Sequence, residues 1–421
     1  MNNLINYLNK SYTAFHAVKN IENLFIENGF QKLEESQKWN ILPNTSYYVI
    51  RNASSIIAFK TPKDVTNTSF NIVASHSDSP CFKLKPNVEI KDGRNEYTKL
   101  NVEPYGGMIA YTWLDRPLGI AGRVFVEEED GVKELLVNFD ETVTIPSVAI
   151  HLNRKNEFAP NPQIDLLPLF GGTKKSFEEV LNKYTNGLET VSFDLFVYNK
   201  EAAYIYGADN EYLASARLDD LECAYTSAKS LIDANPKNIS VCAIFNNEEV
   251  GSRSNNGAAS TLLKDVLERV ALSLNLDIYA ALSNSFIVSA DNGHAVHPNH
   301  PELSDATNAV YMNKGIVIKH QAGLSYTTDA LSEAVFKKIC KLANVPFQDY
   351  TNRSDQRGGS TLGAISLGQI SISSVDIGFP QLAMHSSIET AGVFDIDYML
   401  NAIKKFYEVQ VLKQDNSYKL K

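Results

Sequence analysis

The sequence predicts an α/β protein whose mostly parallel, mixed sheet has helices on both faces, together with an inserted β-rich domain. Apolar strand-like runs alternate with amphipathic helical stretches before residue 88 and after residue 207, as in parallel sheets covered by helices. Between these positions, short alternating segments are separated by turn signals. The 421 residues are also too many for one compact core. We therefore predict a discontinuous domain of residues 1–87 and 208–421, with residues 88–207 inserted into it.

The expected elements of the discontinuous domain follow in order. Residues 1–28 place apolar side chains at helical spacing, and residues 47–59 hold two β-rich runs split by a polar turn. The apolar run FNIVA (70–74) predicts a short strand that leads directly into Ser75 and His76. After the insertion we expect helices at 218–234 and 329–342 and strands at 240–245, 286–290, 316–319 and 370–377.

The inserted region, residues 88–207, has a hairpin signature. Asp130 and Gly131 separate RVFVEE from VKELLV, which is typical of two antiparallel strands joined by a tight turn. VSFDLFVY (191–198) predicts a further strand. Short strands can expose edges and apolar faces that a partner covers, so we expect this domain to drive oligomerisation.

Composition narrows the partners and the compartment. The net charge of −10 gives no bulk attraction for nucleic-acid phosphates. The four cysteines form no C-x-x-C pair, which fits reduced thiols in a cytoplasmic protein. The N-terminal MNNLINYLNK has neither a basic start nor an apolar block, and the uncharged stretch 358–375 is too polar to span a bilayer. We therefore expect neither a nucleic-acid nor a membrane partner.

Metal-binding side chains follow four of the predicted strands. These residues are His76 after 70–74, Glu248 and Glu249 after 240–245, Asp291 after 286–290 and His385 after 370–377. Because ligands bind at the carboxyl ends of strands in open α/β sheets, we expect these side chains to meet in one region. Asp219 opens the predicted helix at 218–234, where a carboxylate suits the helix N-terminus.

The chemistry of this set points to a pair of metal ions. Two imidazoles and three carboxylates without thiolates suit catalytic zinc, with cobalt or manganese as possible substitutes. Five ligands exceed the need of one zinc and fit two metals about 3.5–4 Å apart that share a carboxylate. In the pair Glu248-Glu249, one carboxylate can bind metal while the other takes a proton from water. Asp78 can accept the other ring N–H of His76 and so orient it.

These residues also admit other interpretations. A single His after a strand is more often structural, but suitable residues at four strand ends are hard to explain by chance. Pro298 and Pro301 break any helix through His294, His297 and His300, so these imidazoles cannot share a helical face, and we expect one of them to face substrate. Ser360 is a weak nucleophile candidate because Leu362 stands where a nucleophile elbow needs Gly. A non-catalytic assembly protein is disfavoured because all six chemical positions are intact.

Six segments together resemble a known family. They are HSDSPCFKLKP (76–86), ARLDDL (216–221), FNNEEVGS (245–252), SADNGHAVHPN (289–299), NKGIVIK (313–319) and PQLAMHS (380–386). They are similar to signature segments of the aspartyl aminopeptidases, cocatalytic zinc exopeptidases related to vacuolar aminopeptidase I. SYTAFHAV (11–18) and IPSVAIHLNR (145–154) extend the resemblance over nearly the whole chain.

The resemblance implies a zinc exopeptidase fold and a role for each residue. His76, Asp219 and Asp291 would hold one zinc, and Asp219, Glu249 and His385 the other. Glu248 would be the base that activates water, and His297 would bind substrate. His151 would reach the active site of a neighbouring subunit. The family forms dodecamers and removes N-terminal residues from peptides, typically Asp or Glu. The alternative is a broad-specificity aminopeptidase of the same fold that accepts neutral residues.

An acidic preference would need a fixed cation, because the substrate carboxylate would enter a site rich in carboxylates. Lys319 ends the predicted strand 316–319, and Arg357 precedes a Gly-Gly loop. We favour Lys319, because a strand end is expected to point into the crevice that holds the metal ligands.

Overall fold

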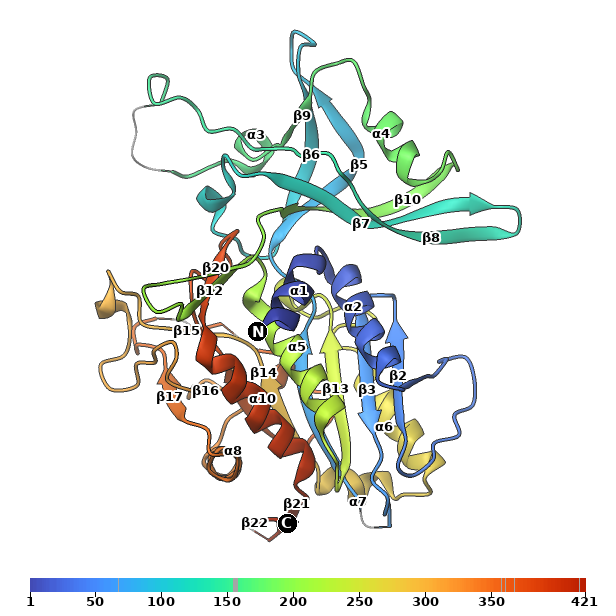
Figure 1. Cartoon of the computed structure of the whole chain (residues 1–421), viewed down its shortest axis with the longest axis vertical. Coiled ribbons are helices and arrows are strands. Elements are labelled where there is room, and N and C mark those ends of the chain that lie inside the picture. The colour runs from blue at the N-terminus through green and yellow to red at the C-terminus, as the bar shows by residue number, and fades with distance from the viewer. Residues whose placement is uncertain (67, 154–157, 357, 360, 367, 416) are drawn as a thin grey trace.

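The structure is a computed structural model that describes residues 1–66, 68–153, 158–356, 358–359, 361–366, 368–415 and 417–421. Arg357 and Ser360, both considered above, lie outside the described residues. Figure 1 shows a layered α/β body with a smaller, β-rich body above it. This arrangement confirms the predicted fold class.

The central sheet is mixed and mostly parallel. Its strands, in spatial order, are β1 (Gln31–Lys32), β2 (Ser46–Arg51), β3 (Ser55–Lys60), β13 (Ile239–Phe245), β4 (Phe70–His76), β14 (Phe286–Ala290), β18 (Ser373–Gly378), β16 (Ile316–His320) and β17 (Phe347–Thr351). The neighbours β13, β4, β14 and β18 are all parallel to one another. Their carboxyl ends therefore lie at the same edge, as the sequence predicts.

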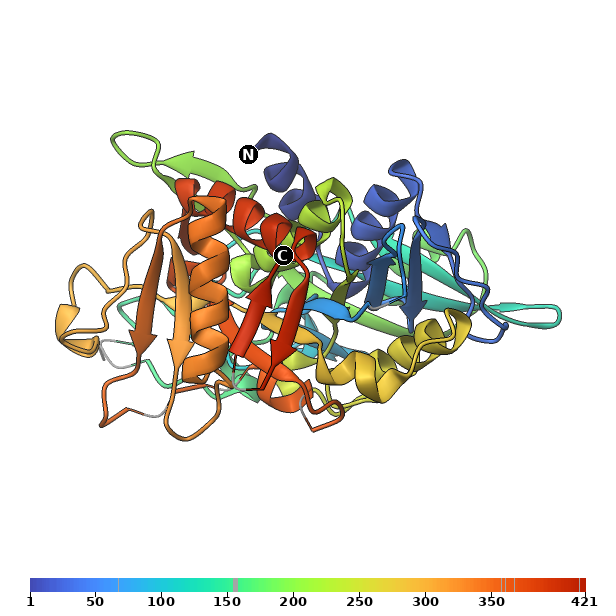
Figure 2. The same cartoon turned by 90° about the horizontal axis from the view of Figure 1, so that it is seen from below.

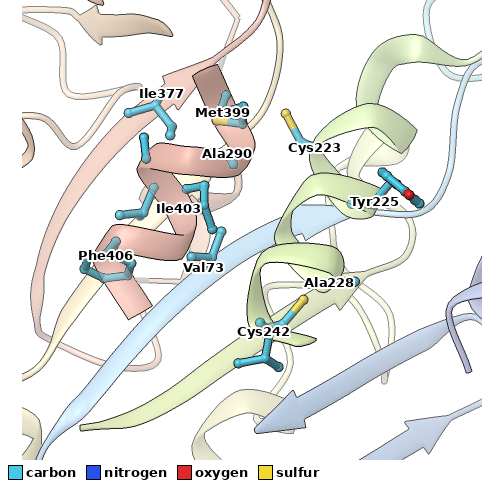
Figure 3. Close-up of a cluster of buried hydrophobic side chains, with 14 of the residues drawn as sticks. Val73, Cys223, Tyr225, Ala228, Cys242, Ala290, Ile377, Met399, Ile403 and Phe406 are labelled. Carbon is cyan, nitrogen blue, oxygen red and sulfur yellow. The ribbon is translucent and has the colours of Figure 1, made fainter. Parts of the chain in front are cut away.

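Helices cover both faces of this sheet (Figures 1 and 2). The helices that share a core on one face are α1 (Asn2–Lys10), α2 (Ala14–Glu27), α5 (Leu218–Asp233), α8 (Ala330–Ala343) and α10 (Val393–Glu408). Those on the other face are α6 (Leu262–Ser273), α7 (Ile278–Ser283) and α9 (Leu362–Ser366). Strand β4 serves both cores, because Val73 packs into the first and Ile72 and Ala74 into the second. Figure 3 shows Val73 between side chains of α5 and α10.

The upper body is a second, antiparallel sheet. Its strands, in spatial order, are β8 (Gly131–Asn138), β7 (Leu118–Glu128), β10 (Thr190–Asn199), β5 (Cys81–Lys91), β6 (Thr98–Tyr105) and β9 (Leu169–Gly171). Two short helices accompany it, α3 (Pro162–Asp165) and α4 (Phe177–Tyr184). β7 and β8 form the expected hairpin at Asp130-Gly131. Because β5 begins at Cys81, the boundary predicted at residue 88 falls within a strand, and the domain division stays a prediction.

A third, small sheet lies at the carboxyl edge of the central one. Its strands are β11 (Tyr204–Tyr206), β12 (Tyr212–Ser215), β20 (Glu389–Gly392), β19 (Pro380–Leu382) and β15 (Gly293–His294). β12 leads into α5 and so into Asp219, β15 follows Asp291, and β19 and β20 flank His385. The sheet therefore joins three loops that the sequence assigns to the site. The chain ends in the hairpin β21 (Val411–Gln414) and β22 (Ser417–Leu420).

Two strand predictions need correction. β16 runs antiparallel to β18, so its carboxyl end does not point toward the edge where the ligands gather. A short apolar run that is buried on both faces reads the same in either direction, so the sequence holds no signal for this reversal. The strand predicted at 370–377 begins only at Ser373. Among the described residues, no helix is long and apolar enough to cross a membrane.

Candidate metal centre

Three of the predicted ligands meet at the carboxyl edge of the central sheet. His76 is the last residue of β4, Asp291 follows β14 directly, and Asp219 lies in the first turn of α5. His76 Nε2 is 3.4 Å from Asp219 Oδ1 and 4.0 Å from Asp291 Oδ1. All three side chains are buried. We call them the first ligand group.

A second ligand group shares Asp219 with the first. His385 Nε2 is 3.6 Å from Asp219 Oδ2 and 3.4 Å from Glu249 Oε1. Glu249 lies in the short turn after β13, and His385 lies in the loop between β19 and β20 with φ of 66°. The two oxygens of Asp219 therefore face different imidazoles, one in each group.

The geometry extends the set of possible ligands by two carboxylates. Asp220 joins the first ligand group, and Glu248 gathers with His76 and Glu249, in each case with the ligand atoms within 4.8 Å of one another. Asp220 Oδ2 also accepts a hydrogen bond of 3.1 Å from the His76 backbone N–H. Asp220 is not among the ligands predicted from the sequence, although it directly follows Asp219.

The charges of the cluster fit a bound cation. Burial raises the pKa of Glu249 well above its ordinary value, that of Asp291 to about 6 and that of Glu248 to about 8. The negative charges of the neighbouring carboxylates act in the same direction. For Asp219, burial acts in the same direction, but the neighbouring imidazoles of His385 and His76 hold its pKa below the ordinary value. Asp219 Oδ1 and Glu249 Oε1 are buried without a hydrogen-bond partner. Nitrogen and oxygen donors with unused lone pairs fit zinc.

Asp78 supports both ligand groups, though by other atoms than predicted. His76 Nδ1 lies 3.0 Å from the Asp78 backbone oxygen and 3.5 Å from its carboxylate, so the carbonyl is the nearer acceptor. The carboxylate instead accepts the backbone N–H groups of Glu248 and Glu249 at 3.1 and 3.2 Å. Asp78 thereby orients His76 through its backbone and the glutamate turn through its side chain.

Glu389 supports two candidate ligands in a similar way, and it is not among the residues predicted from the sequence. Its carboxylate accepts the His385 N–H at 2.7 Å and the Asp219 N–H at 3.0 Å, so it orients one ligand of the second group and the shared ligand. Glu389 is 1% exposed, and burial raises its pKa to about 8. The Glu four residues after His385 was the only available signal, and such spacing is too common to single out.

Lys319 reaches the first ligand group from the reversed strand β16. Its ammonium donates to the Asn292 backbone oxygen at 2.6 Å and lies 3.9 Å from Asp291 Oδ2. The ammonium also lies 5.4 Å from the centre of the Tyr326 ring. At 2% exposed, Lys319 is a desolvated cation beside a candidate ligand. Its proximity to the site therefore comes from side-chain reach and not from the strand end.

The predicted substrate-binding histidines lie farther out. The His297 ring is exposed, and its centre lies 5.3 Å from that of the His300 ring, with the two rings tilted relative to each other. His294, although its side chain is also exposed, lies closer to the cluster, where partial desolvation and the Lys319 charge lower its pKa while Asp219 acts in the opposite direction. His151 is exposed in a turn of the upper body. The structure of the single chain brings neither His297 nor His151 into the ligand groups.

The chain is similar to known proteins over nearly its whole length. A sequence model described as aminopeptidase I zinc metalloprotease (M18) matches residues 7–407. The chain is 44% identical to a probable M18 family aminopeptidase 2 of Clostridium novyi over 97% of this chain and 98% of that protein. It is 35% identical to a probable aspartyl aminopeptidase of Ricinus communis, over 96% of this chain and 94% of that protein.

Solved structures show the same fold. A chain in the cryo-EM structure of the Ape4 and Nbr1 complex matches with a TM-score of 0.91 and 34% identity, over 96% of this chain and 84% of that chain. The Saccharomyces cerevisiae mApe1 dodecamer matches with a TM-score of 0.83 and 25% identity, over 96% and 95% of the two chains. These matches and the convergent His and acidic ligands establish that the chain belongs to the M18 family of zinc aminopeptidases.

Proposed function

We propose that this M18 aminopeptidase binds two zinc ions per chain and removes N-terminal Asp or Glu from peptides. The observation that supports the metal pair is the position of Asp219, whose two carboxylate oxygens lie 3.4 and 3.6 Å from His76 and His385. One carboxylate between two ligand groups is the arrangement that a bridged pair of metals requires. Cobalt or manganese could substitute, because the donors are nitrogen and oxygen.

The zinc ions, Glu248 and the second ligand group have separate roles in the proposed hydrolysis. When bound, zinc lowers the pKa of water toward about 7 and polarises a carbonyl group. Glu248, held by Asp78 through its backbone N–H, accepts the proton of the attacking water. The same carboxyl group then passes this proton to the leaving amine. The free α-amino group of the substrate pairs with carboxylates of the second ligand group, which restricts cleavage to the first residue.

An assay panel tests the proposed activity. Aspartyl, glutamyl and leucyl substrates should be cleaved in that order of preference, with activity lost to a chelator and restored by zinc. A strong preference for leucyl substrates would favour the broad-specificity alternative, and activity that survives removal of all metal would contradict the zinc mechanism. The resemblance to a probable aspartyl aminopeptidase supports the acidic preference.

Lys319 is the proposed determinant of that preference. A buried ammonium 3.9 Å from Asp291 lies beside the metal centre and can pair with an acidic substrate side chain. We expect Lys319→Met to lower kcat/KM for aspartyl relative to leucyl substrates, since a desolvated pair of this kind contributes about 2–5 kcal/mol. Lys314→Met removes the same charge from an exposed position and should leave the ratio unchanged. If kcat/KM fell equally on both substrates and the zinc content also fell, the role of Lys319 would be to hold Asp291 and not to bind the substrate side chain.

The insertion, residues 88–207, is the proposed oligomerisation domain. Its loop between β8 and β9 exposes large apolar side chains: Val148, Ile150, Leu152, Phe158 and Ile164. Exposed apolar side chains that lie close together along one segment can form a surface that a partner covers. The dodecameric yeast relative supports a large homo-oligomer, in which His151 would act from a neighbouring subunit and His297 at the substrate. Light scattering tests this assembly, and a fully active monomer would exclude the role of His151.

The compartment proposed for this enzyme is the cytoplasm. The four cysteines, Cys81, Cys223, Cys242 and Cys340, are free thiols. Free thiols persist in reducing compartments. Fractionation of the source cells with an antibody to the chain would test this, and recovery outside the cytoplasm would contradict it.

A further inference from the structure

The insertion touches the metal centre directly, through the segment that follows β6. His385 Nδ1 lies 2.5 Å from the Gly107 backbone oxygen, while its Nε2 faces Asp219 and Glu249. The Ile109 backbone N–H donates to the His385 backbone oxygen at 2.9 Å. The carbonyl of Gly107 thus orients the imidazole so that Nε2 points at the second ligand group.

Tyr105, at the end of β6, supports the glutamate turn through Asp78. Its hydroxyl donates to Asp78 Oδ2 at 2.7 Å and accepts from Asn247 Nδ2 at 2.9 Å. Burial and the nearby Asp78 charge keep the pKa of Tyr105 far above its ordinary value, so the phenol remains a donor. Because the Asp78 carboxylate also holds the N–H groups of Glu248 and Glu249, one hydroxyl of the insertion fixes the glutamate turn.

Gly106, between these two contacts, lies close to a candidate ligand. Its φ is 73°, and a Cβ added there would lie 3.1 Å from the Cβ of Glu249. A side chain at this position would therefore press on Glu249. Thr112 completes the segment, since its hydroxyl accepts the Ser387 N–H at 2.9 Å, two residues after His385.

We propose that residues 105–112, the insertion clamp, position the ligands of the dinuclear centre, so that docking of the insertion and binding of zinc are thermodynamically coupled. The proposal rests on the proposed two-zinc function and deepens it. Coupling is reciprocal: a docked clamp raises zinc affinity, and bound zinc strengthens the docking. The insertion then has a second role besides assembly, and its removal disables the centre even in a monomer.

Tyr105→Phe tests the hydroxyl contact without changing the shape of the side chain. We expect zinc affinity, measured by competition with a chromogenic chelator, and kcat to fall by about 10–100-fold, as for other contacts that orient metal ligands. Tyr198→Phe is the matched control, because Tyr198 is a buried tyrosine of the insertion whose hydroxyl donates instead to Asn138, at 2.8 Å. Unchanged zinc affinity in Tyr105→Phe, or a change confined to the Tm of the metal-free protein, would overturn the proposal.

A pair of glycine substitutions gives an independent test. Gly106→Ala should lower zinc affinity and alter the visible spectrum of the cobalt-substituted enzyme, because the new methyl group displaces Glu249. Gly187→Ala imposes similar backbone strain at φ 76° in the same domain, but its methyl group meets nothing within 4 Å. It should therefore match the wild type in zinc affinity and spectrum, and equal behaviour of the two variants would overturn the clamp. A wild type that binds one zinc would overturn the proposed function instead, and the clamp would still be judged by the zinc affinities.

Discussion

Replacement of Glu248 by Gln should lower kcat by about 10³–10⁴-fold, near the upper range for loss of a general base, while zinc remains bound. The amide keeps the size of the side chain but cannot accept a proton from water. The turn should keep its position, because Asp78 binds the backbone N–H of Glu248 and not its side chain. Steady-state kinetics together with elemental analysis of the same preparation measures both effects.

The neighbouring Glu249→Gln variant is the control for this assignment. Glu249 Oε1 lies 3.4 Å from His385 Nε2 and has no hydrogen-bond partner, so we expect its loss to weaken zinc at the second ligand group. Because Glu248 also lies within reach of His76 and Glu249, the structure permits the reverse assignment. Loss of zinc from Glu248→Gln with normal zinc content in Glu249→Gln would exchange the roles of the two residues.

Three candidate ligands, His76, Glu249 and Asp291, could be placed together from the sequence because each follows a strand that the sequence marks clearly. Runs such as FNIVA and SVCAIF are apolar throughout, as strands buried on both faces must be. The parallel pairing of β13, β4 and β14 then brings their carboxyl ends together, and His76, Glu249 and Asp291 with them. Local pattern and one general rule of sheet topology are sufficient for this part of the site.

The supporting residues could not be predicted in this way, because their partners are remote in sequence. Tyr105 is 27 residues from Asp78, and Gly107 is 278 residues from His385. Glu389 reaches back 170 residues to Asp219. Such contacts depend on how the insertion and the small sheet sit on the central sheet, which no local periodicity records. Lys319 is the opposite case. It lies beside the site, but the strand direction from which it was predicted is wrong.

Replacement of Asp219 by Asn should reduce zinc content and activity more than the loss of any other single candidate ligand. Asp219 alone belongs to both ligand groups, with one oxygen toward His76 and the other toward His385. The amide offers one oxygen where the carboxylate offers two, and it removes the negative charge that a bridged pair of cations would share. We therefore expect zinc content to fall from about two per chain to below one, a pair being the arrangement inferred from the bridging carboxylate, and activity to fall below detection.

The matched control is Asp291→Asn, which alters a carboxylate of the first ligand group alone. Asp291 Oδ1 lies 4.0 Å from His76 Nε2, and the Lys319 ammonium partly neutralises the Asp291 carboxylate. The loss of this carboxylate should therefore weaken the binding of one zinc and leave the other bound. Elemental analysis after dialysis should then read about one zinc per chain for Asp291→Asn and clearly less for Asp219→Asn. The metal-free forms of both variants should melt close to metal-free wild type, because neither change creates a cavity. If Asp219→Asn retained one tightly bound zinc, as Asp291→Asn should, Asp219 would belong to one metal site and the bridged pair would be excluded.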